Sequence, residues 1–243
     1  MNALELKVGT TINIVNPQNG NMMKIEVPRF GAICSNLPFV AFENLTAEDK
    51  VYTEKLQEET DLDGKSDLSY YITLHLADLL KDEGYLGIIT SNSWLGTTSG
   101  DNFYHALLDK FNLKQVHISG CGRWFKNADV VTTILLLQKI NGINQNPQTS
   151  FFVWRRNLEA INVDINLEKQ IINASLLDKN TDKTIMTRAS YSKKEISELH
   201  SLNLSYNALF HNVKWLLDIQ NCLIPINKLF NVIRGSRRGW DPL

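Results

Sequence analysis

The sequence predicts an α/β fold in which a mostly parallel sheet ends in an antiparallel hairpin and is followed by a mainly helical segment. Between residues 30 and 139, short apolar or β-branched runs alternate with stretches of helical periodicity. This alternation is typical of a parallel sheet with crossover helices. The last two strand-like runs follow each other without a helix between them, which favours an antiparallel pair. After residue 150 helical patterns predominate.

The first elements are expected to be two short strands, at residues 11–15 and 23–27. Pro17, Asn19 and Gly20 lie between them, and these residue types favour a turn.

A third strand is expected at residues 30–35, a continuous apolar run of the kind found in strands that are buried on both faces. Pro38 marks its end, because proline cannot donate to a strand ladder. Residues 43–66 are polar and acidic, and we expect a loop there with at most one helical turn.

Two helices and a strand come next. Residues 67–83 give the clearest helical pattern, and Gly84 is expected to end that helix. Its predicted apolar face consists of Ile72, Leu76, Leu79 and Leu80. A strand follows at 85–90 and a second helix at 101–111.

The predicted hairpin joins a strand at 113–119 to a strand at 128–139, with Gly120 and Gly122 in the link. The second of these runs is dense in Val, Ile, Thr and Leu, which makes it the strongest strand signal in the chain.

A domain boundary is predicted in the polar stretch 141–149. We therefore expect one domain over residues 1–140 and a second region over 150–243. The second region is predicted to begin with a strand at 150–154 and to continue with two helices. Ser192 and Glu195 have capping-box spacing for the first helix. Leu209, Val213, Leu216 and Leu217 form the apolar face of the second.

Composition sets limits on the class of protein. The chain has 243 residues and a net charge of −1, from 25 basic and 26 acidic residues, and this total neither supports nor excludes a nucleic-acid partner. The three cysteines, Cys34, Cys121 and Cys222, are far apart and in no cluster with metal-ligand spacing, so we expect neither disulfides nor a metal. No apolar run approaches the roughly 20 residues that span a bilayer. We expect a cytoplasmic protein with no membrane partner.

The candidate active residues follow the predicted strand at 30–35. In an open α/β sheet, ligands bind beyond the carboxyl ends of the strands. Asn36 offers a side-chain acceptor there, Leu37 a backbone carbonyl and Phe39 a stacking face, while Pro38 makes the turn. Taken alone, these four residues are more often only a turn that ends a strand.

From this motif onward the sequence resembles the adenine-N6-specific DNA methyltransferases of restriction-modification systems. Residues 36–39 are similar to their Asn-Pro-Pro-Tyr/Phe motif, and further similar stretches follow in the family's order. These stretches are V-A-F-E at 40–43, L-G-I-I-T-S-N-S-W-L at 86–95, and F-K-N-A-D-V-V-T at 125–132 with the run 134–139. The resemblance covers about residues 30–139. It implies that the sheet is the C-terminal half of a Rossmann-like methyltransferase sheet.

The resemblance also implies a mechanism, a cofactor and a substrate. Methyl groups would come from S-adenosylmethionine and go to an adenine flipped out of DNA. Asn36 and the Leu37 carbonyl would each accept one hydrogen of the exocyclic amine, which localises its lone pair for attack. Phe39, after the turn at Pro38, would stack on the base, an interaction worth roughly 1–3 kcal/mol.

Four departures from the family pattern matter. Ala41 stands where an arginine is common, and Gly31 stands where the strand often carries an aspartate. Leu37 stands where a proline is usual, which keeps the carbonyl but is expected to leave a free N–H and a less rigid loop. In addition, no Gly-rich strand-to-helix turn precedes Asn36, and Gly9 and Gly20 are isolated. We therefore expect a fragment without the donor-binding half, completed by a missing N-terminal half or a partner subunit.

Basic residues near the end of the chain form a second candidate site. The tail contains Arg234, Arg237, Arg238 and Trp240, and it resembles the entry to the target recognition region of the same family. Arginines with an aromatic residue suit contacts to a phosphate backbone, so these four residues are predicted to bind DNA. By contrast, Arg155 and Arg156 are interpreted as a solvated strand end.

Three functions remain open from the sequence. The leading hypothesis is an adenine-N6 DNA methyltransferase or a fragment or subunit of one. The alternative is a non-catalytic DNA-recognition or scaffold subunit of a restriction-modification complex, which Leu37, Ala41 and the missing donor site favour. A third possibility keeps the chemistry and changes the substrate to RNA or to glutamine side chains.

Overall fold

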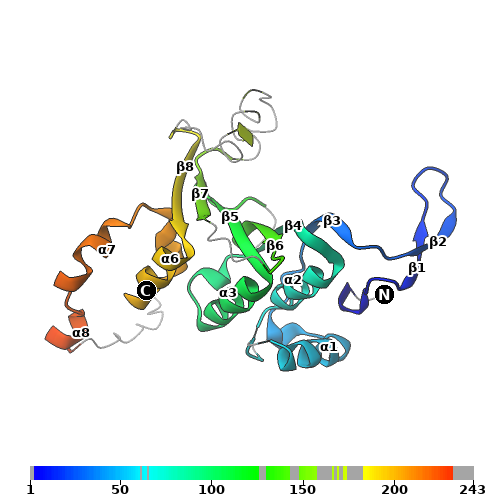
Figure 1. Cartoon of the computed structure of the whole chain (residues 1–243), viewed down its shortest axis with the longest axis horizontal. Helices are drawn as coiled ribbons and strands as arrows, with labels where there is room; N and C mark the ends of the chain where they lie inside the picture. The colour runs from blue at the N-terminus through cyan, green and yellow to red at the C-terminus, as the bar shows by residue number, and fades with distance from the viewer. Residues whose placement is uncertain are drawn as a thin grey trace, which may run out of the picture.

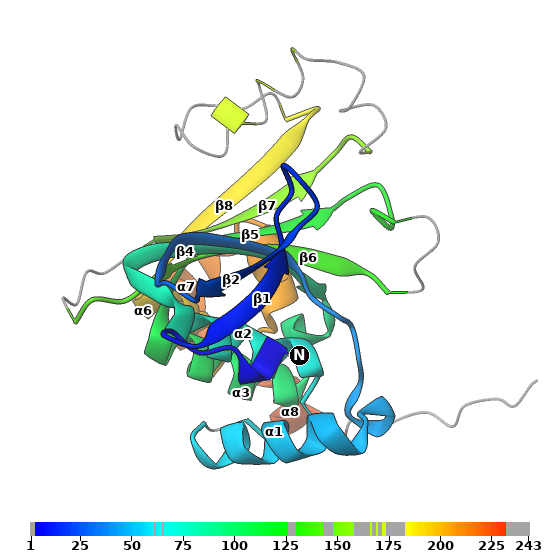
Figure 2. The ribbon, with the colours of Figure 1, turned by 90° about the vertical axis from the view of Figure 1, so that its right-hand side faces the viewer.

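The computed structural model describes residues 3–60, 62–64, 66–125, 130–142, 148–157, 166, 169, 172–173 and 183–231. Its centre is a six-stranded sheet with the helices gathered on one side (Figures 1 and 2). In spatial order the strands are β3 (Phe30–Asn36), β4 (Leu80–Ser91), β6 (Thr132–Lys139), β5 (Phe111–Ser119), β7 (Gln148–Trp154) and β8 (Met186–Ser192).

The sheet is mixed. β3 pairs with β4 and β5 pairs with β7 in parallel, whereas β6 is antiparallel to both of its neighbours and β8 is antiparallel to β7. Four strands therefore run in one direction, and the predicted α/β class with an antiparallel hairpin is confirmed. The hairpin partner β6 lies inside the sheet, between β4 and β5, and Leu135 and Leu137 on this central strand are fully buried.

Helices cover one face of this sheet (Figure 2). Of the main ones, α2 packs against β4, α3 against β5 and α6 against β8, while α1 packs outside α2. Their bounds are α1 (Ala47–Glu58), α2 (Leu68–Leu79), α3 (Thr98–Lys110) and α6 (Lys193–Ser201). The core between them and the sheet contains large buried rings, and Tyr70 of α2 stacks on Phe103 of α3 at 4.2 Å between ring centroids.

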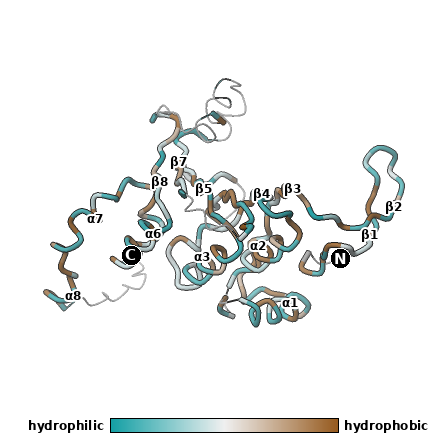
Figure 3. The backbone as a smooth tube through the Cα atoms, viewed as in Figure 1, coloured by the Kyte–Doolittle hydropathy of each residue, from teal (hydrophilic) through white to brown (hydrophobic). Residues whose placement is uncertain are grey.

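The remaining elements are short. A hairpin of β1 (Thr11–Val15) and β2 (Met22–Glu26), as predicted, forms a separate two-stranded sheet. The others are η1 (Ala3–Glu5), η2 (Phe42–Asn44), η3 (Ser93–Leu95), η4 (Tyr206–Phe210), α7 (Trp215–Ile219), η5 (Gln220–Cys222) and α8 (Ile226–Leu229). Figure 3 shows hydrophobic stretches in the central strands and again along α7 and α8. None of the helices in the described part of the chain is long and apolar enough to cross a bilayer.

The structure corrects three expectations in the first half of the chain. Residues 43–66 contain the 12-residue helix α1 instead of a loop. The predicted helix 67–83 ends at Leu79, because Leu80 already pairs with Phe30 in the sheet and Glu83 adopts a positive φ of 61°. β3 is an edge strand with exposed or half-buried residues, so it is not buried on both faces.

The sheet continues past the boundary predicted at 141–149. β7 pairs with β5 and β8 pairs with β7, so the region after residue 150 begins with two strands of the same sheet before α6. The predicted capping box is present at the start of α6, where Ser192 and Glu195 bond reciprocally. The predicted second helix is divided between η4 and α7. The assignment of residues 150–243 to a linker and a target recognition region stays a prediction.

Candidate active site

The candidate motif lies at the carboxyl end of the edge strand β3. Asn36 is the last residue of that strand and is paired with Ile89. The Leu37 N–H donates to the Ile89 carbonyl at 3.2 Å, and the Val40 carbonyl accepts from the Leu68 N–H at 3.0 Å. The turn is therefore anchored to β4 at one end and to the first turn of α2 at the other.

Leu37 compensates for the proline that is usual at the second position of the motif. Its N–H is bonded to β4, so the expectation of a free N–H was wrong. Its side chain is only 3% exposed and belongs to the main core. A leucine can thus hold the turn through one ladder bond and apolar burial, where proline would hold it by restricting φ.

The polar groups of the motif point to a binding role. The Asn36 side chain is exposed, and among the described residues no hydrogen bond engages its amide or the Leu37 carbonyl. Phe39 is half-buried, and Pro38 is exposed. Two uncommitted oxygen acceptors and a half-buried ring therefore lie within four consecutive residues at one end of the sheet, where in open α/β sheets ligands bind.

A group of hydroxyls beside the motif was missed from the sequence. Ser91 at the end of β4 bonds to Ser93 at 2.7 Å between oxygens, and Ser93 bonds to the hydroxyl of Tyr70 on α2 at 2.9 Å. Burial raises the pKa of Tyr70 above its ordinary value, so this hydroxyl stays protonated near neutral pH. No motif marks the group, because the tyrosine and the serines are more than 20 residues apart in sequence.

Two tryptophans near this end of the sheet, Trp94 in η3 and Trp124 after β5, pack within the protein. Trp94 is 1% exposed and donates its Nε1 hydrogen to Thr133. Trp124 lies half-buried against Trp154, at 5.5 Å between ring centroids.

One cross-strand row connects Asn36 to the far side of the sheet. The pairings run from Asn36 through Ile89, Ile134, His117 and Phe152 to Arg188. Paired residues point to the same face of a sheet, so this row lies on the face of the Asn36 side chain.

The middle of this row is a packed polar and aromatic cluster. His117 stacks on Phe152 at 4.6 Å, and its Nδ1 accepts from the indole N–H of Trp154 at 3.0 Å. Burial lowers the pKa of His117 to about 3, so the ring is neutral at physiological pH. Arg188 lies over Phe152 and donates to the hydroxyls of Ser150 and Ser190.

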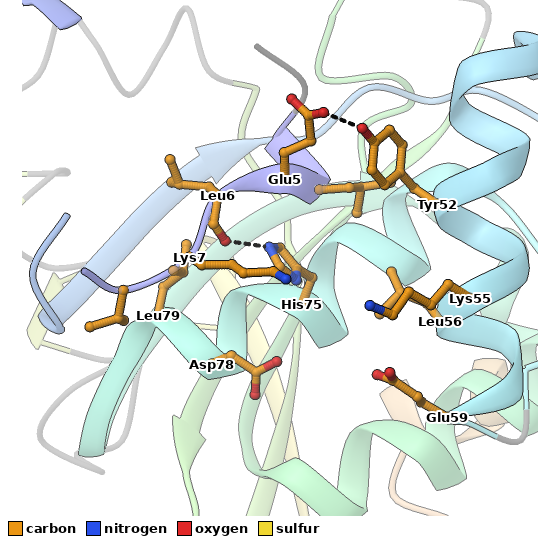
Figure 4. A pocket seen from close by; sticks show the side chains of 12 residues that line it. Glu5, Leu6, Lys7, Tyr52, Lys55, Leu56, Glu59, His75, Asp78 and Leu79 are labelled. Carbon is orange, nitrogen blue, oxygen red and sulfur yellow. Dashed lines mark hydrogen bonds between the residues drawn. The ribbon is translucent and has the colours of Figure 1, made fainter. Parts of the chain in front are cut away.

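A cavity of about 440 Å³ lies elsewhere, between the N-terminal segment, α1 and α2 (Figure 4). His75 bonds there to the Leu6 carbonyl at 2.8 Å, and Tyr52 bonds to Glu5. His75 and Asp78 belong to the C-terminal end of α2, whereas the motif touches the N-terminal end of that helix. This cavity is therefore separate from the motif.

The structure does not supply a donor site before β3. Residues 11–26 form the β1–β2 hairpin, and Gly9 and Gly20 have positive φ values of 83° and 73° in turns instead of opening a helix. A methyl donor that carries a nucleoside needs a strand-to-helix turn where backbone can approach it, and the described residues ahead of Asn36 contain none. The described residues ahead of Asn36 therefore do not provide that part of a donor pocket. Arg234, Arg237, Arg238 and Trp240 lie outside the described residues.

Comparisons with known proteins agree with this arrangement. Residues 6–125 match the family model of the Eco57I restriction-modification methylase. Over 150 residues the chain is 24% identical to the type II methyltransferase M.BanIII of Aneurinibacillus aneurinilyticus, covering 61% of this chain and 25% of that protein.

Solved structures show the same fold. The type IIG restriction endonuclease BpuSI matches with a TM-score of 0.59 at 14% identity, over 91% of this chain and 24% of that one. The methyltransferase subunit of a type I restriction-modification system from Streptococcus thermophilus matches with a TM-score of 0.55 at 20% identity, over 76% of this chain and 38% of that one. The chain thus spans about a quarter of the length of M.BanIII and of BpuSI.

Proposed function

We propose that this chain, whose residues 6–125 belong to the restriction-modification methylases, carries the base-binding half of an adenine-N6 DNA methyltransferase. The observation that carries the proposal is the pair of uncommitted acceptors at Asn36 and Leu37, held on a turn that is anchored at both ends. An exocyclic amine has two hydrogens to donate, and this turn offers one acceptor for each.

The two acceptors act on the nucleophile. The lone pair of an adenine amine is delocalised into the ring, so the nitrogen attacks poorly. Hydrogen bonds from the amine to the Asn36 oxygen and the Leu37 carbonyl favour a tetrahedral nitrogen, with the lone pair directed away from both acceptors. The base has to leave the duplex for this, since its amine is otherwise paired. Phe39 supplies a ring on which the flipped base stacks.

S-adenosylmethionine is the methyl donor that the family implies, and another polypeptide segment has to hold it. This segment is the rest of a longer protein or a partner subunit. β3 is suited to receive it, because it is the end strand of the six-stranded sheet and carries no charged residue and no proline from Phe30 to Asn36. Edges that are not meant to pair are usually protected by such residues. The DNA-binding role of Arg234, Arg237, Arg238 and Trp240 remains part of the proposal.

The second candidate is a non-catalytic DNA-recognition or scaffold subunit of a restriction-modification complex. One observation favours it, namely that the described residues before β3 form a hairpin and no donor turn. The two candidates differ in whether Asn36 matters for methylation.

The test is methyl transfer to DNA by the protein that contains this chain together with the donor-binding part. Products are digested and N6-methyladenine is quantified by mass spectrometry. Asn36→Ala is expected to lower the rate by about a hundredfold or more, the usual effect of removing one hydrogen bond made to a reacting group. Asn44→Ala, an exposed asparagine in η2, is the matched control and is expected to keep the wild-type rate.

Full activity of Asn36→Ala would support the scaffold role. Methyl groups found in RNA, in protein or on cytosine in place of adenine would contradict the proposed substrate.

A further inference from the structure

Basic residues from three segments that are bonded to one another through their backbones lie at the carboxyl ends of β5 and β7 and before the start of β8. Arg123 lies on the loop after β5, Arg155 and Arg156 follow β7, and Lys183 precedes β8, and all four are exposed. The Arg155 N–H donates to the Ile185 carbonyl at 2.7 Å, which joins the last two segments.

The loop after β5 touches the same place. The Gly120 N–H donates to the Trp154 carbonyl at 2.8 Å, and a Cβ added at Gly120 would lie 3.6 Å from the Arg155 Cδ. The segment 154–157, which carries Arg155 and Arg156, contains no Asp or Glu. Two adjacent exposed cations such as Arg155 and Arg156 repel one another, and a bound anion relieves that repulsion.

Asn36 lies at the same end of the sheet as these basic residues, namely where the parallel strands have their carboxyl ends. β3, β4, β5 and β7 all run in the same direction, so Asn36, Ser119 and Trp154 end their strands on the same side. β3 and β7 are four strand spacings apart in the sheet, which is about 19 Å at about 4.8 Å per spacing. Along B-form DNA, at about 3.4 Å per base pair, this distance corresponds to roughly six base pairs.

This end of the sheet has a rigid base. Trp154, next to Arg155, bonds to the buried His117 and packs against Trp124. The Arg155 backbone is anchored by its bond to Ile185 and by the packing of Trp154, while the side chains of both arginines are exposed.

We propose that Arg155 and Arg156, together with Arg123 and Lys183, form a phosphate-binding surface for the DNA duplex, several base pairs from the adenine that reaches Asn36. This inference rests on the proposed function for the nature of the substrate. It revises the interpretation of Arg155 and Arg156 as a solvated strand end, because the sequence places Lys183 and Arg123 far from them, whereas the fold brings all four to one end of the sheet.

The experiment measures binding of the full 243-residue chain to a duplex DNA of about 20 base pairs over a range of salt concentrations. Each phosphate contact contributes about 0.9 to the slope of log K against log salt. Arg155→Ala/Arg156→Ala is expected to reduce that slope by about 1.8 and to weaken binding on the order of 50-fold at 0.1 M salt. Arg155→Lys/Arg156→Lys is expected to retain the slope, since the charge remains.

Lys193→Ala/Lys194→Ala is the matched control. It removes the same charge from two adjacent exposed residues, but these follow β8 at the opposite end of the sheet. Its slope and affinity are expected to stay at the wild-type values.

Three results would each overturn the inference. The two double-alanine variants could lose the same affinity and salt slope, the chain could fail to bind DNA at low salt, or it could bind a duplex RNA more tightly. The binding assay does not depend on methyl transfer. A chain that binds DNA through these arginines while its complete enzyme leaves adenine unmodified contradicts only the proposed function.

Discussion

One face of the six-stranded sheet packs against helices, whereas the other face carries Asn36 and the His117 cluster. The difference is visible in two neighbouring cross-strand rows. The row of Ile88, Leu135, Val116, Phe151 and Ala189 lies in the core, and none of its side chains is more than 7% exposed.

The adjacent row on the other face has a different composition. It begins with the exposed Asn36, continues through the half-buried Ile89 and Ile134, and ends in His117, Phe152 and Arg188. Its packed portion is held by specific polar contacts, such as the bond from Trp154 to His117. The helix-packed row thus consists of buried apolar side chains throughout, while the row on the other face begins with the side chain that we propose to contact the adenine.

The largest expected difference between the faces concerns Leu135 and Leu136, which are neighbours on β6. Leu135 is fully buried under the helices, whereas Leu136 is half-buried on the Asn36 face, between Gly87 and Gln115. Leu135→Ala is expected to lower the free energy of unfolding by about 2–5 kcal/mol, because it removes buried methyl groups and leaves a cavity. Leu136→Ala is expected to cost about 1 kcal/mol or less, in proportion to its smaller burial.

Urea unfolding of the two variants and the wild type provides the measurement. Equal losses of unfolding free energy for both variants would mean that the Asn36 face is as tightly packed in solution as the helix-packed face. This result would contradict the difference between the two faces.

The sequence was most informative where burial gives the apolar residues of a strand or helix a regular spacing. Apart from α1, the strand and helix order from residue 30 to 139 was predicted correctly, since the central strands and the helices α2 and α3 are rich in buried apolar residues. α1 was missed because only scattered apolar residues such as Leu56 contact the core, while its other positions are polar. The burial of β3 was overestimated, because an apolar run does not reveal whether a neighbouring strand is present.

The motif could be located from the sequence, but its setting could not. Whether the Leu37 N–H is satisfied depends on the register of β3 against β4. The contact between Arg155 and the segment that carries Lys183 depends on β8 pairing with β7, and no periodic signal in the sequence between them predicts that pairing. Long-range pairing of this kind is set by the fold as a whole and not by local propensity.

The next prediction concerns pH and the Asn36 face. Burial lowers the pKa of His117 to about 3 in the folded protein, against an ordinary value near 6.5. Between these values the unfolded chain binds a proton that the folded chain does not, so stability falls as the pH is lowered below about 6.5. At pH 5 this group alone is expected to reduce the free energy of unfolding by about 2 kcal/mol relative to pH 7.5.

His117→Gln is expected to lose most of this pH dependence, whatever its stability at pH 7.5. His105→Gln, at an exposed position on α3, is the control and is expected to retain it. The measurement is urea unfolding at both pH values. An unchanged pH dependence in His117→Gln would show that the cluster admits water or a proton and is less closed than the contacts imply.

The smallest expected effect concerns the helix-packed face and its dependence on α6. The Ser192 hydroxyl accepts from the Glu195 N–H at 3.2 Å, and the Glu195 carboxylate accepts from the Ser192 N–H at 2.7 Å. Ser192→Ala is expected to cost about 1 kcal/mol in unfolding free energy, since one end of the helix loses a cap. Ser197→Ala, at an exposed position inside the same helix, is expected to be neutral or slightly stabilising because alanine favours helices.

Neither variant touches the Asn36 face, so both should bind DNA like the wild type. If Ser192→Ala weakens DNA binding at a temperature where the protein is folded, the two faces are coupled through β8, and the separation between a stabilising face and a binding face does not hold.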